Sequence, residues 1–335
     1  MSKERLELLL DTARGLDQLI ILPHNDPDPD AIASAVALRY LLAEAAGLAG
    51  QIFYQGIIGR AENRALVRYL HHPLQPLGET ALNQATPIAL IDTQPGVGNN
   101  PWTPDARTLI IIDHHPWRKS SAKAEFADVR AEVGATSTML LGYLQAARLE
   151  LPTWLATALF YGIKTDTAGL SRNVSSVDVA AYFFLQPRLD VDALAEIERA
   201  QVPAAYFKSF ATTLETTQVY DNVALAYVGA MDYPDLTAEV ADLLLRLEEI
   251  EWVICFGVYQ NNLLLAIRAA EPSQDAGLLA QAIVEQDGVA GGHSSMAGGQ
   301  IPLKGRDPDK LVEQLKQRAL QQLLVRSEAT GRTLI

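Results

Sequence analysis

The stretch QLIILPHNDPDPDAIASAVALRYLL, residues 18–42, decides how we expect this chain to fold. Residues 18–22 form a short apolar run that ends at Pro23, as a buried strand does. The apolar run 31–48, broken by only a few charged residues, is typical of a helix. Between the two lies the polar turn HNDPDPD, residues 24–30. The stretch therefore predicts a strand, a polar turn and a helix, which is the repeating unit of an α/β fold.

The same alternation continues outward through the first half of the chain. Further strand-like runs occupy residues 51–57, 87–91 and 108–112. Helix-like runs occupy residues 60–70, 136–147 and 153–163. Short apolar strands that alternate with helices predict a parallel sheet covered on both faces.

A second, smaller α/β unit is expected after a helical connector. Strand-like runs at 251–258 and 263–268 predict a hairpin that turns at residues 260–262, because asparagine tolerates left-handed turn positions. A Gly-rich loop at 288–299 and a helix at 308–325 follow. The predicted domains are residues 1–187, a connector at 188–207 and residues 208–335.

Composition narrows the classes of function. The chain has 335 residues, 49% of them hydrophobic and 20% charged, which is ordinary for a folded protein. With a net charge of −13, the chain lacks the overall positive charge of proteins that bind long nucleic acids. This does not exclude a local basic pocket for a short anion. The single cysteine, Cys255, excludes an internal disulfide and lies in an apolar run, so we expect a buried thiol.

Targeting signals are not apparent in the sequence. The most apolar long stretch, residues 31–50, is interrupted by Arg39 and Glu44, which suits an amphipathic helix better than a membrane span. Residues 1–14 mix charges of both signs and lack the pattern of a secretory signal. We therefore expect a cytoplasmic protein with no membrane partner.

Histidine and aspartate gather where the predicted strands end. Because the carboxyl ends of parallel strands lie along one edge of a sheet, we expect these side chains to share one site. Several acids so close together repel one another unless a cation neutralises them. The bland alternative is an acidic surface turn in which Asp30 caps a helix. The candidates at the strand ends are His24, Asp28, Asp30, Asp92, Asp113, His114 and His115, and a further candidate, Asp166, comes just past the helix-like run 153–163.

Imidazole and carboxylate ligands without thiolate favour a divalent ion of the manganese type. One ion does not need so many ligands, whereas a pair of ions bridged by one carboxylate does. Such a pair lowers the pKa of a bridging water and clamps a phosphoryl group. The sequence therefore predicts two divalent cations, with Mn²⁺ the first choice.

These motifs resemble those of a known family. HNDPDPDA (24–31), ID (91–92), DHH (113–115) and TDT (165–167) are similar, in order and spacing, to motifs I to IV of the DHH phosphoesterases. AGGHSSMAGG (290–299) resembles the GGGH motif of the DHH-associated C-terminal domain. The overall layout is similar to the nanoRNase/pAp-phosphatase branch, which implies an active site in the cleft between the two domains.

The resemblance also implies roles for single residues. His24 and Asp28 would hold the first ion, and Asp92 would bridge to the second. The second ion would be held by Asp30, His114 and Asp166. His115 would face the substrate phosphate, and Asp113 would orient a ligand histidine.

A substrate-binding role is implied in the C-terminal domain. The glycine loop at Gly291, Gly292 and His293 would cradle a terminal phosphate, because glycines let backbone N–H groups approach an anion. Arg268 would contact the substrate phosphate or base. Two positions depart from the family pattern: Pro29 replaces the usual glycine between two acids, and Ala290 replaces the first glycine of the GGGH motif.

The implied activity is metal-dependent hydrolysis of short oligonucleotides, linear dinucleotides such as pApA, or pAp to nucleoside monophosphates. Inorganic pyrophosphatase or exopolyphosphatase activity is one alternative, and a catalytically silent nucleotide sensor is another. Trp102 and Trp117 flank the motifs and either pack in the core or stack on bases. Lys164, Arg172 and Arg118 lie near the motifs, and each is either a surface charge or a partner for substrate. The sequence leaves the oligomeric state open, with a homodimer among the options.

Overall fold

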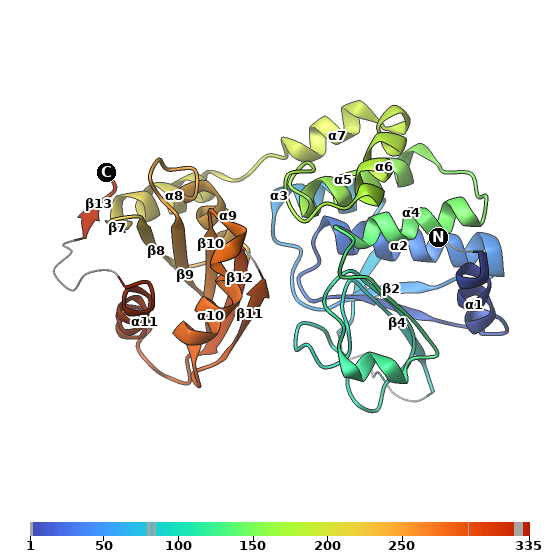
Figure 1. Cartoon of the computed structure of the whole chain (residues 1–335), viewed down its shortest axis with the longest axis horizontal. Coiled ribbons are helices and arrows are strands. Elements are labelled where there is room, and N and C mark those ends of the chain that lie inside the picture. Colours follow the sequence, from blue (N-terminus) through green and yellow to red (C-terminus); the bar gives the residue numbers. More distant parts are fainter. Residues whose placement is uncertain (1–2, 79–81, 83–84, 294, 325–330) are drawn as a thin grey trace. The chain divides into compact units, whose positions relative to one another are not determined.

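The structure is a computed structural model that describes residues 3–78, 82, 85–293, 295–324 and 331–335. The chain divides into two compact units, Met1–Ala200 and Gln201–Ile335 (Figure 1). Residues 188–207, expected as one connector, are shared between them: α7 (Val191–Glu198) lies in the first unit, and α8 (Ala204–Thr216) opens the second. In the described part of the chain, no helix is both long enough and apolar enough to cross a membrane.

The first unit contains a six-stranded sheet in the order β3-β2-β1-β4-β5-β6, and every neighbouring pair is parallel. This confirms the predicted α/β fold class. In this order the chain reverses direction across the sheet between β1 and β4, the place where open α/β sheets bind ligands. The strands are β1 (Ile20–Pro23), β2 (Gln51–Tyr54), β3 (Leu74–Pro76), β4 (Pro87–Ile91), β5 (Arg107–Asp113) and β6 (Phe126–Val129).

Two cores cover the faces of this sheet. Alternate residues such as Ile21 and Ile110 pack against the helices, while Leu22 and Ile111 face a second, smaller core with Trp102 beside it. This alternation follows from the two-residue period of a strand. The helices are α1 (Lys3–Ala13), α2 (Pro29–Ala46), α3 (Ala61–Tyr69), α4 (Thr136–Ala146), α5 (Thr153–Asp166) and α6 (Ser176–Leu185).

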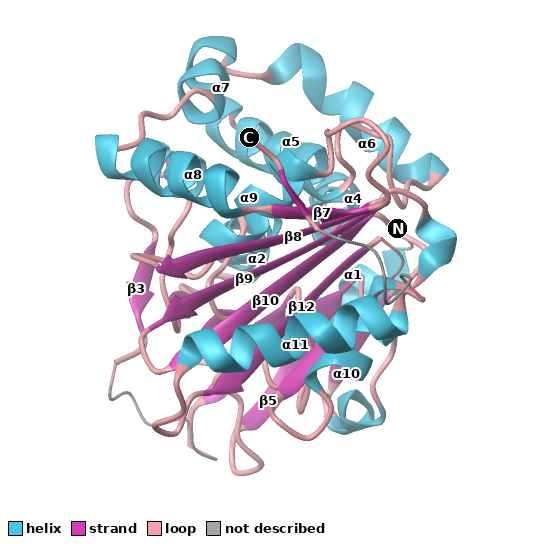
Figure 2. Ribbon diagram, turned by 90° about the vertical axis from the view of Figure 1, so that its left-hand side faces the viewer, coloured by secondary structure: helices cyan, strands magenta, loops and turns pink. Residues whose placement is uncertain are grey.

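The second unit is built on a seven-stranded mixed sheet (Figure 2). Helices α10 (Ala276–Val284) and α11 (Pro308–Gln322) pack on one face, and α8 and α9 (Leu236–Leu244) pack on the other, where Cys255 is fully buried as expected. The strands are ordered β11-β12-β10-β9-β8-β7-β13. They are β7 (Gln218–Tyr220), β8 (Val223–Ala230), β9 (Trp252–Tyr259), β10 (Asn262–Ala269), β11 (Val289–His293), β12 (Met296–Pro302) and β13 (Arg332–Thr333).

The predicted Gly-rich loop at 288–299 is wrong: most of these residues form β11 and the start of β12, which pair antiparallel. Glycine disfavours strands in general, but it is used in sheets where another backbone comes close. A Cβ on Gly292 would lie 2.4 Å from the Ala297 Cα. Ala290 pairs with Gly299 in this hairpin and has no positive φ, so alanine there causes no backbone strain.

Candidate metal centre

The predicted candidates of the first unit meet at the carboxyl ends of β1, β4 and β5, on both sides of the β1/β4 reversal. His24 directly follows β1, Asp92 follows β4, and Asp113 is the last residue of β5. Ligand atoms lie within 4.8 Å of one another in each of three overlapping groups. The groups are His24 with Asp28 and Asp92, Asp30 with His114 and Asp166, and Asp92 with His114 and His115.

Asp92 stands where these groups overlap. One carboxylate oxygen, Oδ2, lies 3.6 Å from the Nε2 of His24, and the other, Oδ1, lies 3.4 Å from the Nε2 of His114. The residue is 2% exposed and has a φ of 59°, a left-handed conformation that aspartate adopts more readily than most residues. The Thr136 hydroxyl donates to Oδ1 over 2.8 Å. Asp92 therefore presents one oxygen to each histidine, as a bridging ligand would.

His24 and Asp28 face Asp92 from the turn after β1. The Nδ1 of His24 donates to the Asn25 carbonyl oxygen over 2.8 Å, which leaves the Nε2 lone pair directed toward the carboxylates. Asp28 Oδ1 lies 3.7 Å from that Nε2 and accepts from the Ala31 N–H. The third acid of the turn, Asp26, accepts instead from the Ile57 N–H over 2.7 Å and ties the turn to the segment after β2.

The helix cap is Asp28, not Asp30 as the bland alternative supposed, and α2 begins at Pro29. The first position of a helix needs a φ near −65° and no N–H donor, which is what proline supplies. Pro29 is therefore compatible with this turn, although the related family has glycine there.

Asp30 is the second residue of α2 and is completely buried against the start of α4. Its two oxygens accept from the Thr136 and Ser137 N–H groups over 2.7 and 2.8 Å. These are the first two amides of α4, so the Asp30 carboxylate already occupies the N-terminus of this helix. Gly162 of α5 allows this close packing, because a Cβ there would lie 2.6 Å from the Ser137 Oγ and 3.0 Å from the Asp30 Cα.

His114 gives the clearest evidence that a cation fits here. Its Nδ1 donates to the Val133 carbonyl oxygen over 3.2 Å, and its Nε2 is buried without a hydrogen-bond partner. That Nε2 lies 3.1 Å from the Asp166 Oδ2. Asp166 is the last residue of α5, whereas the sequence had placed it just beyond the helix. Burial would lower the pKa of His114, but Asp166 and Asp92 outweigh it and raise that pKa well above its usual value. An imidazole nitrogen and a carboxylate oxygen facing each other at this distance match the donor set of a divalent ion.

The pKa values of the clustered side chains show that their negative charges need a cation to balance them. Burial and the nearby Asp92 and Asp166 carboxylates raise the pKa of Asp30 well above its usual value. Burial also raises the pKa of Asp92. Burial would lower the pKa of His24, yet Asp28 and Asp92 outweigh it and raise that pKa to about 10. Without another cation, the negative charge of these carboxylates is therefore balanced by protons, either on the carboxylates themselves or on the neighbouring histidines.

Asp113 binds His115, a member of the third candidate ligand group, and the implied role of orienting a ligand histidine stays a prediction. Its Oδ1 accepts from the Nδ1 of His115 over 2.8 Å and from the His115 backbone N–H over 3.2 Å. Burial opposes ionisation of Asp113, but the hydrogen bond from His115 outweighs it and lowers the pKa of Asp113. The His115 side chain is 40% exposed, so it can be reached from solvent.

Sequence analysis missed Gln94, which holds this pair in place. Gln94 is 1% exposed, and its Nε2 donates to Asp113 Oδ2 over 2.6 Å and to the Pro116 carbonyl oxygen over 3.1 Å. Its Oε1 accepts from the Arg118 N–H and the Ser121 hydroxyl. Its place two residues after Asp92 was the only available signal. Thr136, the donor to Asp92, was singled out only as the start of a helix.

The substrate-binding candidates lie in the second unit. Arg268 of β10 and His293 of β11 both pair in register with Met296 of β12. Arg268 is 7% exposed, and its guanidinium donates to Asp242 over 2.5 Å and to the Ile267 carbonyl oxygen over 3.0 Å. Gly291 and Gly292 are exposed on the edge strand, and the side chain of His293 lies outside what the structure describes. Arg268 is therefore a buried, ion-paired residue rather than an open anion site.

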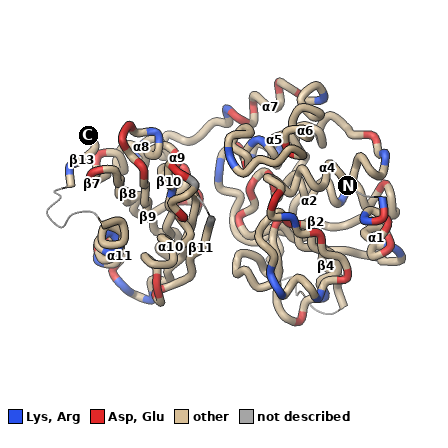
Figure 3. The backbone as a smooth tube through the Cα atoms, viewed as in Figure 1, with Lys and Arg blue, Asp and Glu red and all other residues tan. Residues whose placement is uncertain are grey.

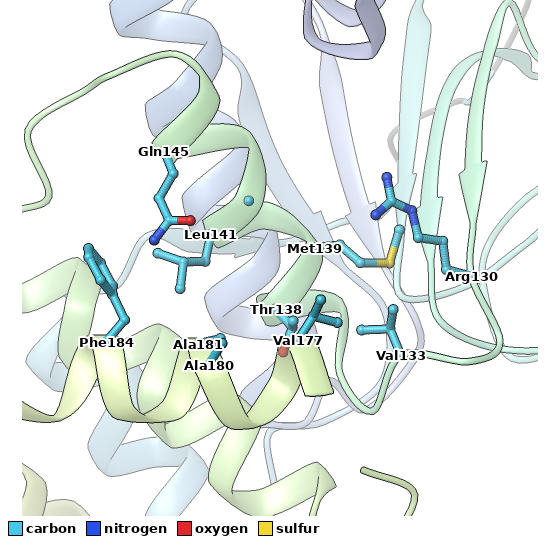
Figure 4. Close-up of a pocket in the computed structure, with 11 residues that line it drawn as sticks. Arg130, Val133, Thr138, Met139, Leu141, Gln145, Val177, Ala180, Ala181 and Phe184 are labelled. Atoms are coloured by element: carbon cyan, nitrogen blue, oxygen red, sulfur yellow. The ribbon is translucent and has the colours of Figure 1, made fainter. Parts of the chain in front are cut away.

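A hollow of about 300 Å³ lies between α4 and α6 (Figure 4). Its lining is mostly apolar, with side chains such as Leu141 and Phe184. Two of its polar residues are already engaged, because Arg130 pairs with Asp128 and the Thr138 hydroxyl donates to Asp178. The hollow supplies no ionisable group for the chemistry of the metal centre.

The fold places the chain among α/β proteins with a parallel sheet, and the cluster at the carboxyl ends of β1 and β4 has the residue types of a metal site. Residues 18–163 match the family model described as "DHH family, N-terminal domain". This part of the chain is therefore a DHH family N-terminal domain, as motifs I to III indicated, while the likeness to the C-terminal domain and the likeness to the nanoRNase/pAp-phosphatase branch stay predictions.

Individual relatives extend the likeness. The uncharacterized protein MJ1633 of Methanocaldococcus jannaschii is 37% identical over 286 residues, which are 85% of this chain and 58% of that protein. A "probable manganese-dependent inorganic pyrophosphatase" of Listeria innocua is 26% identical over 156 residues, 45% of this chain and 49% of that protein. The chain thus spans only about half the length of these relatives.

Among solved structures, an exopolyphosphatase-related protein from Bacteroides fragilis has a TM-score of 0.73 and 15% identity. The match covers 97% of this chain and 98% of that one. At this identity the likeness is one of fold, and it extends through both units.

Proposed function

We propose that this chain is a metal-dependent phosphoesterase that hydrolyses short oligonucleotides, linear dinucleotides such as pApA, or pAp. The observation that carries the proposal is the convergence of six ligand-type side chains, Asp92 among them, with the buried His114 Nε2 lacking a hydrogen-bond partner among the residues that the structure describes. Four of the six are carboxylates, whose formal charge two divalent cations would balance. We assign His24, Asp28 and Asp92 to one ion and Asp30, His114 and Asp166 to the other, with Asp92 shared.

When bound, two such ions would polarise a phosphoryl group and lower the pKa of a water molecule. The protein supplies the rest. Asp113 accepts the Nδ1 proton of His115 and so fixes the ring orientation and tautomer. In the imidazolium form, which Asp113 stabilises, the opposite ring nitrogen Nε2 also carries a proton. We assign this N–H to the substrate phosphate, as a hydrogen-bond donor or as the acid that protonates the leaving oxygen.

The second unit is proposed to bind the far end of the substrate through Gly291, Gly292 and His293. The exposed backbone of the β11 edge strand supports this assignment. For Arg268 the support is its register with Met296 and β11, although its guanidinium is already held by Asp242. We propose that its role is to shape this end of the sheet and to meet substrate only through its remaining N–H groups.

A pyrophosphatase or polyphosphatase activity is the second candidate. It is favoured by the names of the Listeria innocua relative, a probable inorganic pyrophosphatase, and of the Bacteroides fragilis protein, which is exopolyphosphatase-related. A silent nucleotide sensor is less well supported, because all six proposed ligands are present and near one another. Loss of catalysis would be expected to remove at least one of them.

One assay separates these functions. Purified protein is stripped with EDTA, reloaded with Mn²⁺, Mg²⁺ or Zn²⁺, and given pApA, pAp, a short RNA, cyclic di-AMP and pyrophosphate. We expect metal-dependent release of nucleoside monophosphate, fastest with Mn²⁺. Turnover of pyrophosphate alone would favour the second candidate, and undiminished activity in EDTA would refute the metal centre.

A further inference from the structure

A tripeptide beside His115 has properties that the metal centre does not use. Trp117 is 51% exposed, and Arg118 and Lys119 that follow it are also exposed. Of these, Trp117 packs in no core cluster of the described chain, in contrast to Trp102, which packs beside a core and donates its Nε1–H to Thr108 over 3.0 Å. The sequence left both tryptophans open between packing and stacking, and the structure separates them.

The tripeptide is held close to the metal centre. Trp117 is two residues from His115, so their Cα atoms are no more than about 7.6 Å apart. The Gln94 amide binds the backbone on each side of the indole, at the Pro116 carbonyl oxygen and the Arg118 N–H. The Ser120 hydroxyl donates to the Pro95 carbonyl oxygen. The indole is therefore displayed from a backbone that is already ordered, which reduces the entropy lost on binding a ligand.

Charge around the indole points to an anionic partner. The side chains of Arg118 and Lys119 form no ion pair with any residue that the structure describes. The 40 acidic and 27 basic residues are interspersed along both units (Figure 3), so two adjacent cations without an acidic partner leave a local positive charge. An exposed aromatic ring next to unpaired cations is the combination that binds single-stranded nucleic acid, by stacking on a base and by neutralising phosphate.

We propose that Trp117, Arg118 and Lys119 form a base-binding subsite, which restricts the substrate to phosphate esters that carry a nucleobase. Trp117 stacks on one base, and the two cations bind the phosphate attached to that nucleotide. The subsite extends the proposed function, on which it rests for its substrate, and it argues against pyrophosphate as the natural ligand. A single exposed tryptophan would be unremarkable; its fixed backbone, its cations and its place beside His115 make the case.

The test is equilibrium binding of a 5′-phosphorylated dinucleotide containing 2-aminopurine, followed by its fluorescence in EDTA and again with Ca²⁺. Trp117→Ala is expected to weaken binding by roughly 5- to 150-fold, the range of one base–aromatic stack. Trp117→Phe keeps an aromatic face and is expected to recover most of that loss. Phe183→Ala removes a 59% exposed aromatic side chain on α6 and serves as the matched control.

The charged residues have their own readout. Arg118→Ala with Lys119→Ala is expected to lower the slope of log Kd against log salt concentration by roughly 1 to 1.5, as for two lost phosphate contacts on a single strand. Lys208→Ala, an exposed cation of α8, should leave the slope unchanged. All variants should melt within a few degrees of the parent protein, since they change exposed side chains.

The outcomes separate the subsite from the activity. Wild-type affinity in Trp117→Ala, or a parent protein that does not bind the dinucleotide, overturns the subsite. An equal loss of pyrophosphate binding also overturns it, because it would show that the substitution disturbs the metal centre. Tryptophan-dependent binding in a protein that hydrolyses no phosphate ester would support the subsite and refute the proposed function.

Discussion

The cluster around Asp92 in the first unit and the ion pairs of the second unit differ in how their charges are balanced. In the first, Asp30 and Asp92 are buried together, and burial raises the pKa of each. In the second, Arg268 is paired with Asp242, and Asp287 accepts from Arg306 and Arg318. A buried charge is costly unless it is paired. These ion pairs of the second unit therefore balance their own charge, as the pairing of Asp128 with Arg5 and Arg130 does in the first unit. By contrast, we propose that the cluster around Asp92 takes a cation from outside.

The strongest test of this contrast is Asp92→Asn. The amide keeps the size of the side chain and can still accept from Thr136, but it removes the shared carboxylate between the two groups of ligands. We expect turnover to fall by more than about 100-fold, beyond the loss typical of residues that only support a ligand. Bound metal per chain, measured by elemental mass spectrometry, should fall in parallel. Asp287→Asn is the matched control in the second unit, and a similar loss of metal there would remove the contrast.

Gln94→Met should have the next largest effect. It removes the donor to Asp113 but adds no charge to the buried position. We expect kcat to fall by about 10- to 100-fold, with metal content unchanged. Gln145→Met, on the surface of the hollow beside α4, controls for the substitution itself. If KM rises while kcat holds, Gln94 does not act through Asp113 and His115.

Gly162→Ala tests whether close helix packing shapes the metal centre. The new Cβ would crowd the Ser137 Oγ and the Asp30 Cα, so we expect a loss of about 1–3 kcal/mol in the free energy of unfolding, with weaker metal binding. Chemical denaturation measures the first effect and titration calorimetry the second. Gly298→Ala, where the added Cβ would have ordinary contact at 3.6 Å, should change the stability little.

A smaller effect is expected from pH on the second unit. Hydrogen bonds from Arg318 and Arg306 lower the pKa of Asp287 in the folded state. Its contribution to stability is therefore present above the unfolded pKa near 4 and is lost as pH falls through the lower folded value. We expect Asp287→Asn to cost roughly 0.5–1 kcal/mol at pH 7 and to approach the parent protein below pH 3, as measured by urea unfolding. A pH-independent difference would contradict this pairing.

We expect the Cys255 thiol not to react with alkylating reagents in the native state. The thiol is fully buried, and burial raises its pKa. We expect iodoacetamide to leave it unmodified at pH 8 until the protein is unfolded, as followed by mass spectrometry. Rapid native labelling would show that this face of the second sheet opens.

The sequence was most informative where a physical rule links residues far apart in the chain. Apolar strands that end in Asp92 and Asp113 predict a shared edge, because parallel strands align their carboxyl ends. The short strands β3 and β6 were not predicted, since three or four residues carry too little periodicity. Asp26 could not be told from Asp28 by residue type, because only the fold shows that it binds the Ile57 amide. Gln94 likewise depends on contacts with a stretch 19 to 24 residues further along the chain, from Asp113 to Arg118.

The Asp30 carboxylate has a mechanical consequence, because it also anchors the first amides of α4. At the other end of that helix, the Tyr143 hydroxyl donates to Asp128, which is also bound by Arg5 of α1. We therefore expect metal binding at Asp30 to affect α4, whose other end is connected to α1 through Tyr143, Asp128 and Arg5. Amide hydrogen exchange at Thr136 and Ser137 would report occupancy directly, without a substrate or a coloured ion.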